Sequence, residues 1–309
     1  MRILSDKYIA GFLDSDGSVS IGTNGRLRMV FTQKLSNDGV IERIYEALGK
    51  GSLCESNGRT RGTISYRKDL IIQGQAAVDI LCRLKPFMVV KRRKANQLLS
   101  ELGFTERVGS DSIPVQPSRS WLAGYFDGDG CVYACKNKHN DTASVKVSIV
   151  TNAKETEGIE LVRKVFGGDI VVRENKATWT LRLNPSNAEK FLSYIAPRLL
   201  NKREQVYFVL ACARMGHFRD GENISNILRA MKTHPHRLND LTSEVDVSIY
   251  VAQVKDLIVA NGKRYRHYVG QKCTTCGSEK YYAKGKCNPC WQHERYINKD
   301  EAIVGTMSY

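Results

Sequence analysis

Two short segments of the chain each end in a pair of aspartates and a glycine. Residues 9–17 read Ile-Ala-Gly-Phe-Leu-Asp-Ser-Asp-Gly, and residues 122–130 read Leu-Ala-Gly-Tyr-Phe-Asp-Gly-Asp-Gly. Carboxylate oxygens are ligands for hard divalent cations, so these acids are the strongest candidates for chemistry. Their spacing of about 110 residues is too long for a solenoid repeat and indicates two subdomains built alike.

Each aspartate pair lies at the end of an apolar stretch with helical character, in which an Ala-Gly pair allows another helix to approach closely. If the two helices pack together, Asp14 and Asp16 converge with Asp127 and Asp129 at helix C-termini, where each carboxylate is unfavourable by about 0.3–1 kcal/mol. A divalent cation relieves this repulsion, and oxygen-only ligands favour Mg²⁺.

A simple helix end and a calcium loop are the alternatives to a magnesium site at the repeated motif. Asp-x-Asp-Gly can end a helix in a turn, but two copies with the same hairpin pattern after them make this alternative weak. A calcium EF-hand loop is excluded, because its sixth position would be Val19 or Val132 where glycine is needed.

The elements around the first motif follow from periodicity and turn residues. We expect a hairpin that turns at Asn24-Gly25, a helix over 37–48 closed by Gly49, and a hairpin over 53–66 that turns near Asn57-Gly58. Helices over about 74–84 and 91–102 complete this half.

The pattern restarts after the second motif. It predicts, in order, strands over 131–135 and 144–150, a helix over 154–166, strands over 170–173 and 178–183, and helices over 186–196 and 201–215. The sequence therefore predicts an α+β protein with two αββαββα halves. The expected organisation is a first half at 1–107, a Gly/Ser/Pro-rich linker at 108–119, a second half at 120–216, a connecting segment at 217–262 and a C-terminal module at 263–309.

Over about residues 5–215 the two motifs resemble those of the LAGLIDADG homing endonucleases, in the single-chain form with a pseudo-two-fold axis. The resemblance implies saddle-shaped antiparallel sheets. It also implies that the last acid of each motif, Asp16 and Asp129, binds the catalytic metal ions. Asp14 and Asp127 would then support the helix ends at the interface.

Two further pairs of residues match patterns of this family. Gln33 lies where a polar side chain organises water in the active site, and Asn152 is its expected counterpart, although Asn replaces Gln. Lys91 and Lys202 each follow a proline by five residues. The resemblance places them beside the scissile phosphates, whereas each lysine alone could be an exposed helix start.

The implied activity is site-specific hydrolysis of one phosphodiester in each strand of double-stranded DNA, which leaves short 3′ overhangs. Metal ions would activate the attacking water and stabilise the leaving oxygen, so no protein nucleophile is needed. No Ser-His or Cys-His pairing is persuasive. The competing hypothesis is a nucleic-acid binder without cleavage, such as an intron RNA maturase or a transcription factor on the same scaffold.

The charge of the chain favours a polyanionic partner. It has 47 Lys and Arg residues against 32 Asp and Glu residues, a formal net charge of +15. A strand exposes alternate residues on opposite faces, so the sheets can offer polar rows to a DNA groove. The candidates from the strands and their turns are Ser18, Ser20, Arg26, Arg28, Arg59, Arg61, Arg67, Tyr133, Lys136, Lys138, Lys146, Arg173, Thr180 and Arg182.

These candidates differ between the two halves, which implies an asymmetric target. One chain supplies both halves, so the protein is expected to act as a monomer.

The C-terminal module carries a strong metal signal. Two Cys-x-x-Cys pairs, formed by Cys273, Cys276, Cys287 and Cys290, suit tetrahedral Zn²⁺. The surrounding segment is basic and rich in tyrosine, and its candidate DNA contacts are Lys263, Arg264 and Arg266. We expect a zinc module that lengthens the DNA footprint, with a purely structural role as the alternative.

The remaining features exclude other classes of protein. No apolar run is long enough to span a membrane, and the N-terminus has no signal-peptide hydrophobic region. Of the nine cysteines, four cluster near the C-terminus and the other five are scattered along the chain. This usage is typical of a reducing compartment. We therefore expect an intracellular protein, in a bacterial or phage-infected cytoplasm or an organelle, that is not secreted.

Overall fold

The computed structural model describes residues 4–34, 39–60, 63–112, 116–136, 143–172, 177–214 and 228. All of them belong to the first of two compact units, Met1–Ala252. The first half runs through α1 (Asp6–Asp16), β1 (Gly17–Ile21), β2 (Leu27–Lys34), α2 (Gly39–Leu48), β3 (Ser52–Thr60), β4 (Thr63–Gln73), α3 (Gln75–Leu84), η2 (Lys85–Phe87), α4 (Arg92–Glu101) and η3 (Thr105–Arg107). The second half runs through α5 (Arg119–Asp129), β5 (Gly130–Lys136), β6 (Ala143–Asn152), α6 (Glu157–Phe166), β7 (Asp169–Val172), β8 (Thr178–Leu183), α7 (Pro185–Ile195), η4 (Ala196–Arg198) and α8 (Arg203–Arg214).

Each half contains one four-stranded antiparallel sheet, and the two sheets have the same topology. The strand orders are β1-β2-β4-β3 and β5-β6-β8-β7. The predicted α+β class and the αββαββα order of elements are confirmed. In both halves the helices pack on one face of the sheet, and the side chains on that face are buried, for example Phe31 and Leu70 in the first half and Ile149 and Leu181 in the second.

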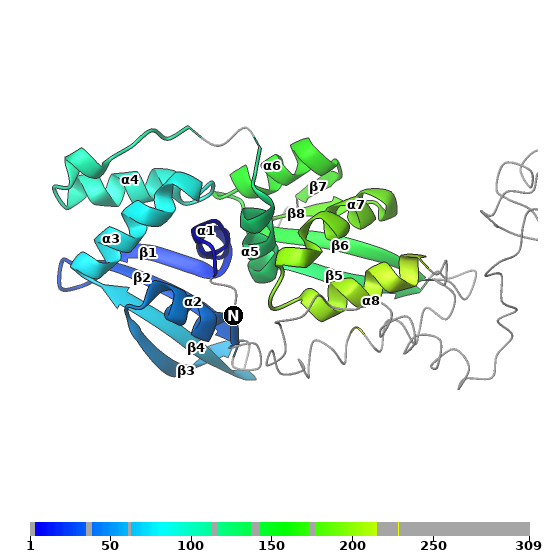
Figure 1. Ribbon diagram of the computed structural model, residues 1–309, viewed down its shortest axis with the longest axis horizontal. Coiled ribbons are helices and arrows are strands. Elements are labelled where there is room, and N and C mark those ends of the chain that lie inside the picture. The colour runs from blue at the N-terminus through cyan, green and yellow to red at the C-terminus, as the bar shows by residue number, and fades with distance from the viewer. Residues whose placement is uncertain are drawn as a thin grey trace, which may run out of the picture. The chain divides into compact units, whose positions relative to one another are not determined.

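The two motif helices begin in the same way. Ser5 accepts a hydrogen bond from the backbone N–H of Tyr8 at 3.3 Å, and Ser118 accepts one from Trp121 at 3.1 Å. A serine at this position satisfies a backbone donor that a helix start leaves unpaired. The helices α1 and α5 that follow lie side by side (Figure 1).

The predicted turns are partly right. Gly25 has φ +69° at the hairpin between β1 and β2, and Gly49 has φ +63° directly after α2, where a left-handed residue ends a helix. The predicted turn near Asn57-Gly58 is wrong. Both residues lie inside β3, and the ladder with β4 continues as far as the pair Thr60–Thr63. Continued backbone pairing outweighs the local turn preference of this dipeptide.

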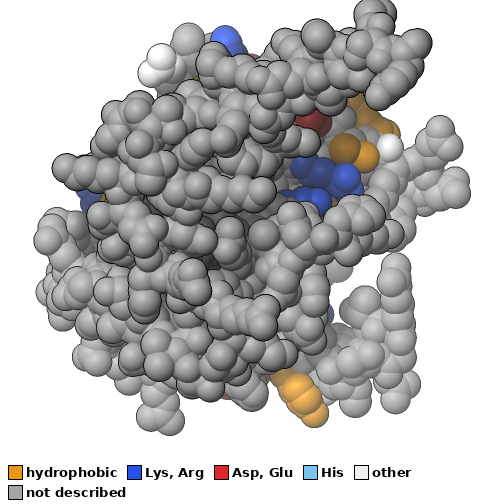
Figure 2. All heavy atoms as spheres, turned by 90° about the vertical axis from the view of Figure 1, so that its right-hand side faces the viewer, with side chains coloured by type: hydrophobic (Ala, Val, Ile, Leu, Met, Phe, Trp, Pro, Cys, Tyr) orange, Lys and Arg blue, Asp and Glu red, His pale blue; other side chains and the backbone are white. Residues whose placement is uncertain are grey.

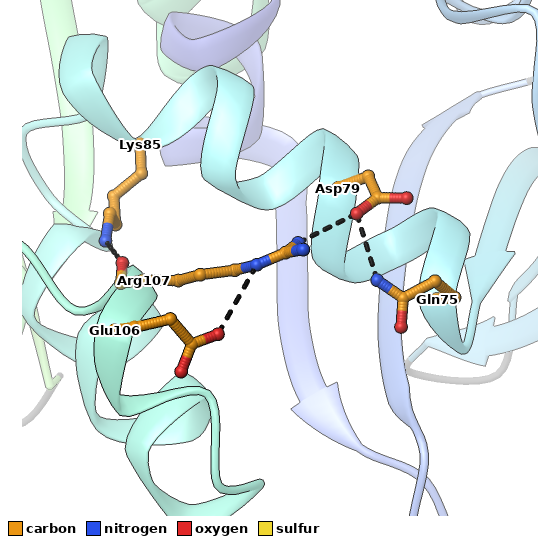
Figure 3. A network of polar contacts seen from close by, with 5 residues as sticks. All are labelled: Gln75, Asp79, Lys85, Glu106 and Arg107. Atoms are coloured by element: carbon orange, nitrogen blue, oxygen red, sulfur yellow. Dashed lines mark hydrogen bonds and ion pairs between the residues drawn. The ribbon is translucent and has the colours of Figure 1, made fainter.

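The segment predicted as a linker is bound to the first half at its beginning. Just before this segment, Arg107 of the first half contacts Asp79 of α3 at 2.8 Å, and the amine of Lys85 donates to the Arg107 carbonyl (Figure 3). Asn96 of α4 donates to the carbonyl of Gly109 at 2.9 Å and to the Asp111 carboxylate at 2.6 Å. Residues 108–112 therefore follow α4 closely, and α5 begins at Arg119.

Candidate active site

The two motif helices touch at backbone level where the sequence places glycine. A Cβ atom on Gly11 would lie 2.1 Å from the carbonyl oxygen of Trp121, and one on Gly124 would lie 2.1 Å from that of Tyr8. No side chain fits in either gap. The near-identical geometry of the two contacts shows that the motif repeat produces a pseudo-two-fold arrangement.

The first acid of each motif is buried and held by three donors. Asp14 accepts hydrogen bonds from the backbone N–H of Val89 at 2.6 Å and of Lys91 at 2.9 Å. Asp127 accepts them from Leu200 at 2.7 Å and Lys202 at 2.9 Å. Burial raises the pKa of Asp14 and of Asp127, and these amide donors oppose the rise. Both acids therefore fix each motif helix to the segment before α4 or α8, as the resemblance implies.

The third donor to each buried acid comes from the other half of the protein. The indole Nε1 of Trp121 donates to Asp14 at 2.9 Å, and the hydroxyl of Tyr8 donates to Asp127 at 2.7 Å. Burial, followed by the negative charge of Asp127, raises the pKa of Tyr8 well above its usual value, so its proton stays in this bond. Sequence reasoning missed both residues. The sequence did contain a signal, because in each half an aromatic side chain with a polar hydrogen lies three residues before the glycine of the Ala-Gly pair.

Lys91 and Lys202 close the C-terminal ends of the motif helices. The amine of Lys91 donates to the carbonyls of Leu13, Asp14 and Ser15, at 3.1, 2.5 and 3.2 Å. Lys202 does the same for Phe126, Asp127 and Gly128. The alternative of exposed helix starts is wrong for Lys91, whose residue surface is only 5% exposed. Each amine provides positive charge where a helix end is partly negative.

Asp16 and Asp129 are the half-buried last residues of α1 and α5, and they influence each other electrostatically. Burial and then the charge of Asp16 raise the pKa of Asp129 to about 7. Burial also raises the pKa of Asp16, and Lys202 of the other half opposes this rise more than Lys91 does. The charges of Lys91 and Lys202 act on both carboxylates, so one site combines residues of both halves.

Gln33 contacts the acid of its own half. Its side-chain nitrogen donates to Asp16 at 3.0 Å, and the residue is buried on the helix-covered side of β2. This contact suits the role expected for a residue that orders groups around the acid.

The expected counterpart of Gln33 is corrected by one residue. Gly17 pairs with Phe31 in the first sheet, and Gly130 pairs with Ile149 in the second, so Gln33 corresponds to Thr151 and not to Asn152. Thr151 is buried and donates to the Glu155 carbonyl at 2.8 Å. Asn152 is exposed and accepts a hydrogen bond from the backbone N–H of Lys154 at 3.0 Å. A shift of one residue on a strand changes the face, which explains the difference.

Many of the predicted DNA contacts lie on the sheet faces opposite the helices. By strand register, these residues are Ser18, Ser20, Arg28, Arg67, Tyr133, Lys146, Thr180 and Arg182. Arg26 is exposed in the hairpin between β1 and β2. The side chains of Arg59 and Lys136, and residues Arg61, Lys138 and Arg173, lie outside the described residues. On the coloured part of the face in Figure 2, Lys and Arg side chains gather beside hydrophobic ones.

Other predicted sites fall elsewhere. Cys273, Cys276, Cys287 and Cys290, with Lys263, Arg264 and Arg266, lie outside the described residues. Among the residues that are described, no group of three or more His, Cys, Asp or Glu side chains is placed to hold a metal ion. In the same part of the chain, no helix has the length and apolar character of a membrane span.

The fold is that of the LAGLIDADG meganucleases. A crystal structure of LAGLIDADG meganuclease I-AabMI bound to uncleaved DNA matches with a TM-score of 0.55 and 14% identity, over 75% of this chain and 100% of that one. Meganuclease I-SmaMI bound to uncleaveable DNA matches with a TM-score of 0.54 and 15% identity, over 74% of this chain and 97% of that one. At this level of identity the match establishes the fold.

Two curated relatives are intron-encoded proteins. A probable intron-encoded endonuclease 4 of Neurospora crassa is 21% identical over 60% of this chain and 35% of its own length. An intron-encoded RNA maturase bI4 of Saccharomyces cerevisiae is 27% identical over 55% of this chain and 25% of its own length. The match thus spans about a third or less of each relative. No protein-family model matches the chain.

Proposed function

We propose that this protein is a site-specific endonuclease that cuts both strands of a long, asymmetric double-stranded DNA target. The observation that carries the proposal is the coupling of Asp16 and Asp129 at the ends of two helices in backbone contact. The basic rows on the open faces of both sheets, together with the net charge of +15, support DNA as the substrate. The proposal includes an intracellular location.

The two acids fit Mg²⁺. They offer oxygen ligands only, and Mg²⁺ is commonly held by one or two carboxylates together with substrate phosphate. The charge of Asp16 contributes to the raised pKa of Asp129, and a bound divalent cation would offset this repulsion. When bound, such a cation would polarise the phosphate and lower the pKa of an attacking water.

The protein residues would position these groups. Asp16 and Asp129 would act as the ligands, one for each strand, and Gln33 would orient Asp16 and nearby water through its 3.0 Å contact. Asn152 keeps only the role of a predicted polar neighbour, because Thr151 occupies the register position of Gln33. Lys91 and Lys202 would act through the motif helices and through their charge, since their amines already serve three carbonyls each. Cleavage of each strand would leave short 3′ overhangs.

Zn²⁺ is proposed for the cysteines at 273, 276, 287 and 290, as a structural ion in a module that extends the DNA contact. A single chain carries both halves of the site, so a monomer would suffice.

The test is a cleavage selection with the full chain. A randomised or genomic double-stranded DNA library is incubated with Mg²⁺, and cut ends are sequenced; a parallel reaction omits the metal. We expect one family of cut sites that depends on Mg²⁺. Asp16→Asn should still bind the selected site but fail to make double-strand breaks, while Asp6→Asn, at the opposite end of the same helix, should cut normally. Full cutting by an Asp16→Asn/Asp129→Asn double variant would refute the assignment.

A second candidate function is binding of an intron RNA, as in a maturase. The match to a relative that is an RNA maturase favours it. Binding of the host intron RNA with faster splicing, together with no cut sites in the DNA selection, would support this alternative.

A further inference from the structure

The two sheets can be compared position by position because their registers are anchored at the motif glycines. Gly17 lies opposite Phe31, and Gly130 lies opposite Ile149. Counting from these pairs, Thr32 of the first sheet matches Val150 of the second, and Asp69 matches Thr180. All four lie on the face opposite the helices, where the proposed DNA contacts are.

The first sheet carries an acid in the middle of this face. Asp69 of β4 accepts a hydrogen bond from the hydroxyl of Thr32 at 2.7 Å on one oxygen, and from the hydroxyl of Ser56 at 2.8 Å on the other. Thr32 is on β2 and Ser56 is on β3, so the carboxylate is held from both neighbouring strands. A carboxylate has about four lone-pair sites, and two remain available for other donors.

The matching row of the second sheet has no acid. Val150 lies opposite Thr180, and Val171 lies opposite Thr180 on the other side. Val150 is 40% exposed, so its methyl groups are accessible on this face. Methyl groups of this kind suit the C5-methyl of thymine.

In the next row along the strands the difference is reversed, because the first sheet carries apolar residues and the second sheet carries polar ones. In the first sheet it holds Val30 opposite Ile71, two half-buried apolar residues. In the second sheet the corresponding row is Ser148, Arg182 and Asp169. Arg182 and Asp169 are both exposed. Arginine reads guanine through two hydrogen bonds, which Ile71 cannot do.

We propose that these two rows determine the asymmetry of the target, with Asp69 as a specificity-determining residue. Asp69 accepts a hydrogen bond from the exocyclic amino group of a cytosine or adenine in the major groove. The pseudo-symmetric base pair in the other half-site faces Val150, Thr180 and Val171 and presents thymine methyl. One row further, Arg182 reads a guanine where the first half-site faces Val30 and Ile71. This inference rests on the proposed DNA target.

Electrostatics favours this role over simple cross-linking of strands. A carboxylate facing a DNA phosphate backbone is repelled, and its neighbours on the same face include the exposed Lys34 and Arg67. An acid there is favourable toward DNA only when an amino donor of a base approaches it. The hydroxyls of Thr32 and Ser56 fix the two oxygens, so the acceptor is already oriented for a base edge.

The test is a binding selection from randomised double-stranded DNA without divalent cation, so that cleavage is not required. Wild-type full-length protein is compared with two variants that exchange residues between the halves, Asp69→Thr and Arg182→Ile. Asp69→Thr should lower the preference for cytosine or adenine at one position of one half-site by about tenfold and leave the other half-site unchanged. Arg182→Ile should lower a guanine preference by a similar factor in the opposite half-site.

Two controls separate recognition from stability. Glu55→Thr changes an exposed acid on the opposite face of the same sheet and should leave base preference unchanged. Thr32→Val removes one hydroxyl donor but keeps the carboxylate, so it should weaken discrimination for the same base. If Asp69→Thr selects sites with unchanged base preferences and shows only a uniform loss of affinity or a lower melting temperature, the inference about Asp69 is wrong. The proposed function would stand in that case. No enrichment of any DNA by the wild-type protein would instead overturn the proposed function on which it rests.

Discussion

Asparagine in place of Asp129 should make the magnesium-free protein more stable. The pKa of Asp129 is raised from 3.8 to about 7 by burial and by the nearby charge of Asp16. A folded-state pKa above the unfolded value means that folding favours the protonated acid, so the stability it contributes is present at low pH and is lost as the pH rises toward 7. Asparagine has the same shape and does not ionise, so the variant avoids this loss.

The size of the gain follows from the pKa shift. One pKa unit corresponds to about 1.36 kcal/mol, so a shift of about three units destabilises the ionised wild-type protein by roughly 4 kcal/mol near pH 8 and by roughly 1.5 kcal/mol near pH 5. Because Asp129 is partly exposed, these values are upper bounds. The variant should therefore gain up to about 2.5 kcal/mol over wild type between the two pH values. For a chain of 309 residues this corresponds to roughly 4 °C in melting temperature.

The assay is thermal unfolding of both full-length proteins across this pH range in magnesium-free buffer. Asp127→Asn, two residues earlier in α5, is the matched control of opposite sign. Asp127 accepts hydrogen bonds from Tyr8, Leu200 and Lys202, and an asparagine NH₂ group would face one of these donors, so this variant should lose stability. Added Mg²⁺ should stabilise wild type more than Asp129→Asn. An Asp129→Asn protein that is less stable than wild type near pH 8 would refute the proposed repulsion.

Three further predictions concern the helix interface, the lysines and the C-terminal module. Gly124→Ala should cost several kcal/mol of stability by chemical denaturation and disturb cleavage, since its methyl would overlap the Tyr8 carbonyl. Gly22→Ala should fold normally, because its methyl would meet the Asn24 side chain at 3.1 Å and the Arg26 carbonyl oxygen only at an ordinary contact distance of 3.6 Å. Lys91→Met should lower stability by about 1–3 kcal/mol because three carbonyls lose their donor. Lys94→Met, at an exposed position in the α4 helix that follows Lys91, should have little effect, and equal stability of both variants would contradict the capping role. The purified chain should contain one zinc ion by elemental analysis, and Cys276→Ala should lose it. This variant should also bind DNA more weakly, by a factor that depends on the salt concentration. Unchanged affinity would leave the module with a structural role.

The sequence predicted those features that depend on local pattern and repetition. The motif repeat identified Gly11 and Gly124, and with them the helix contact, because only glycine permits such an approach. The alternation of polar and apolar residues around Val19 and Ile149 predicted two of the strands, and both of these side chains are buried. Asp14 and Asp127 were distinguished from Asp16 and Asp129 by the resemblance, and the hydrogen bonds of the first pair agree with that distinction.

Features that depend on register or on distant contacts were not predictable in the same way. Asn152 was predicted from its match to the family pattern. Strand pairing shows instead that Thr151 occupies the position in the second sheet that corresponds to Gln33 in the first, and nothing local to the segment fixes that pairing. The turn near Asn57-Gly58 failed for a related reason, since the ladder between β3 and β4 continues beyond it. Tyr8 and Trp121 donate to acids more than a hundred residues away, a relation that becomes visible only when the two helices are packed.

The two halves share a scaffold but differ where chemistry and recognition would occur. In both, a buried aspartate receives three donors and a lysine closes the helix end, so these parts position the motif helices in the same way. Asp16 has the amide of Gln33 within hydrogen-bond distance, whereas the matching Thr151 donates to a backbone carbonyl. The sheet rows differ in the same sense, with Asp69 in one half and Thr180 in the other. A single chain can vary each half independently, which a symmetric dimer cannot, and this freedom is what recognition of an asymmetric target requires.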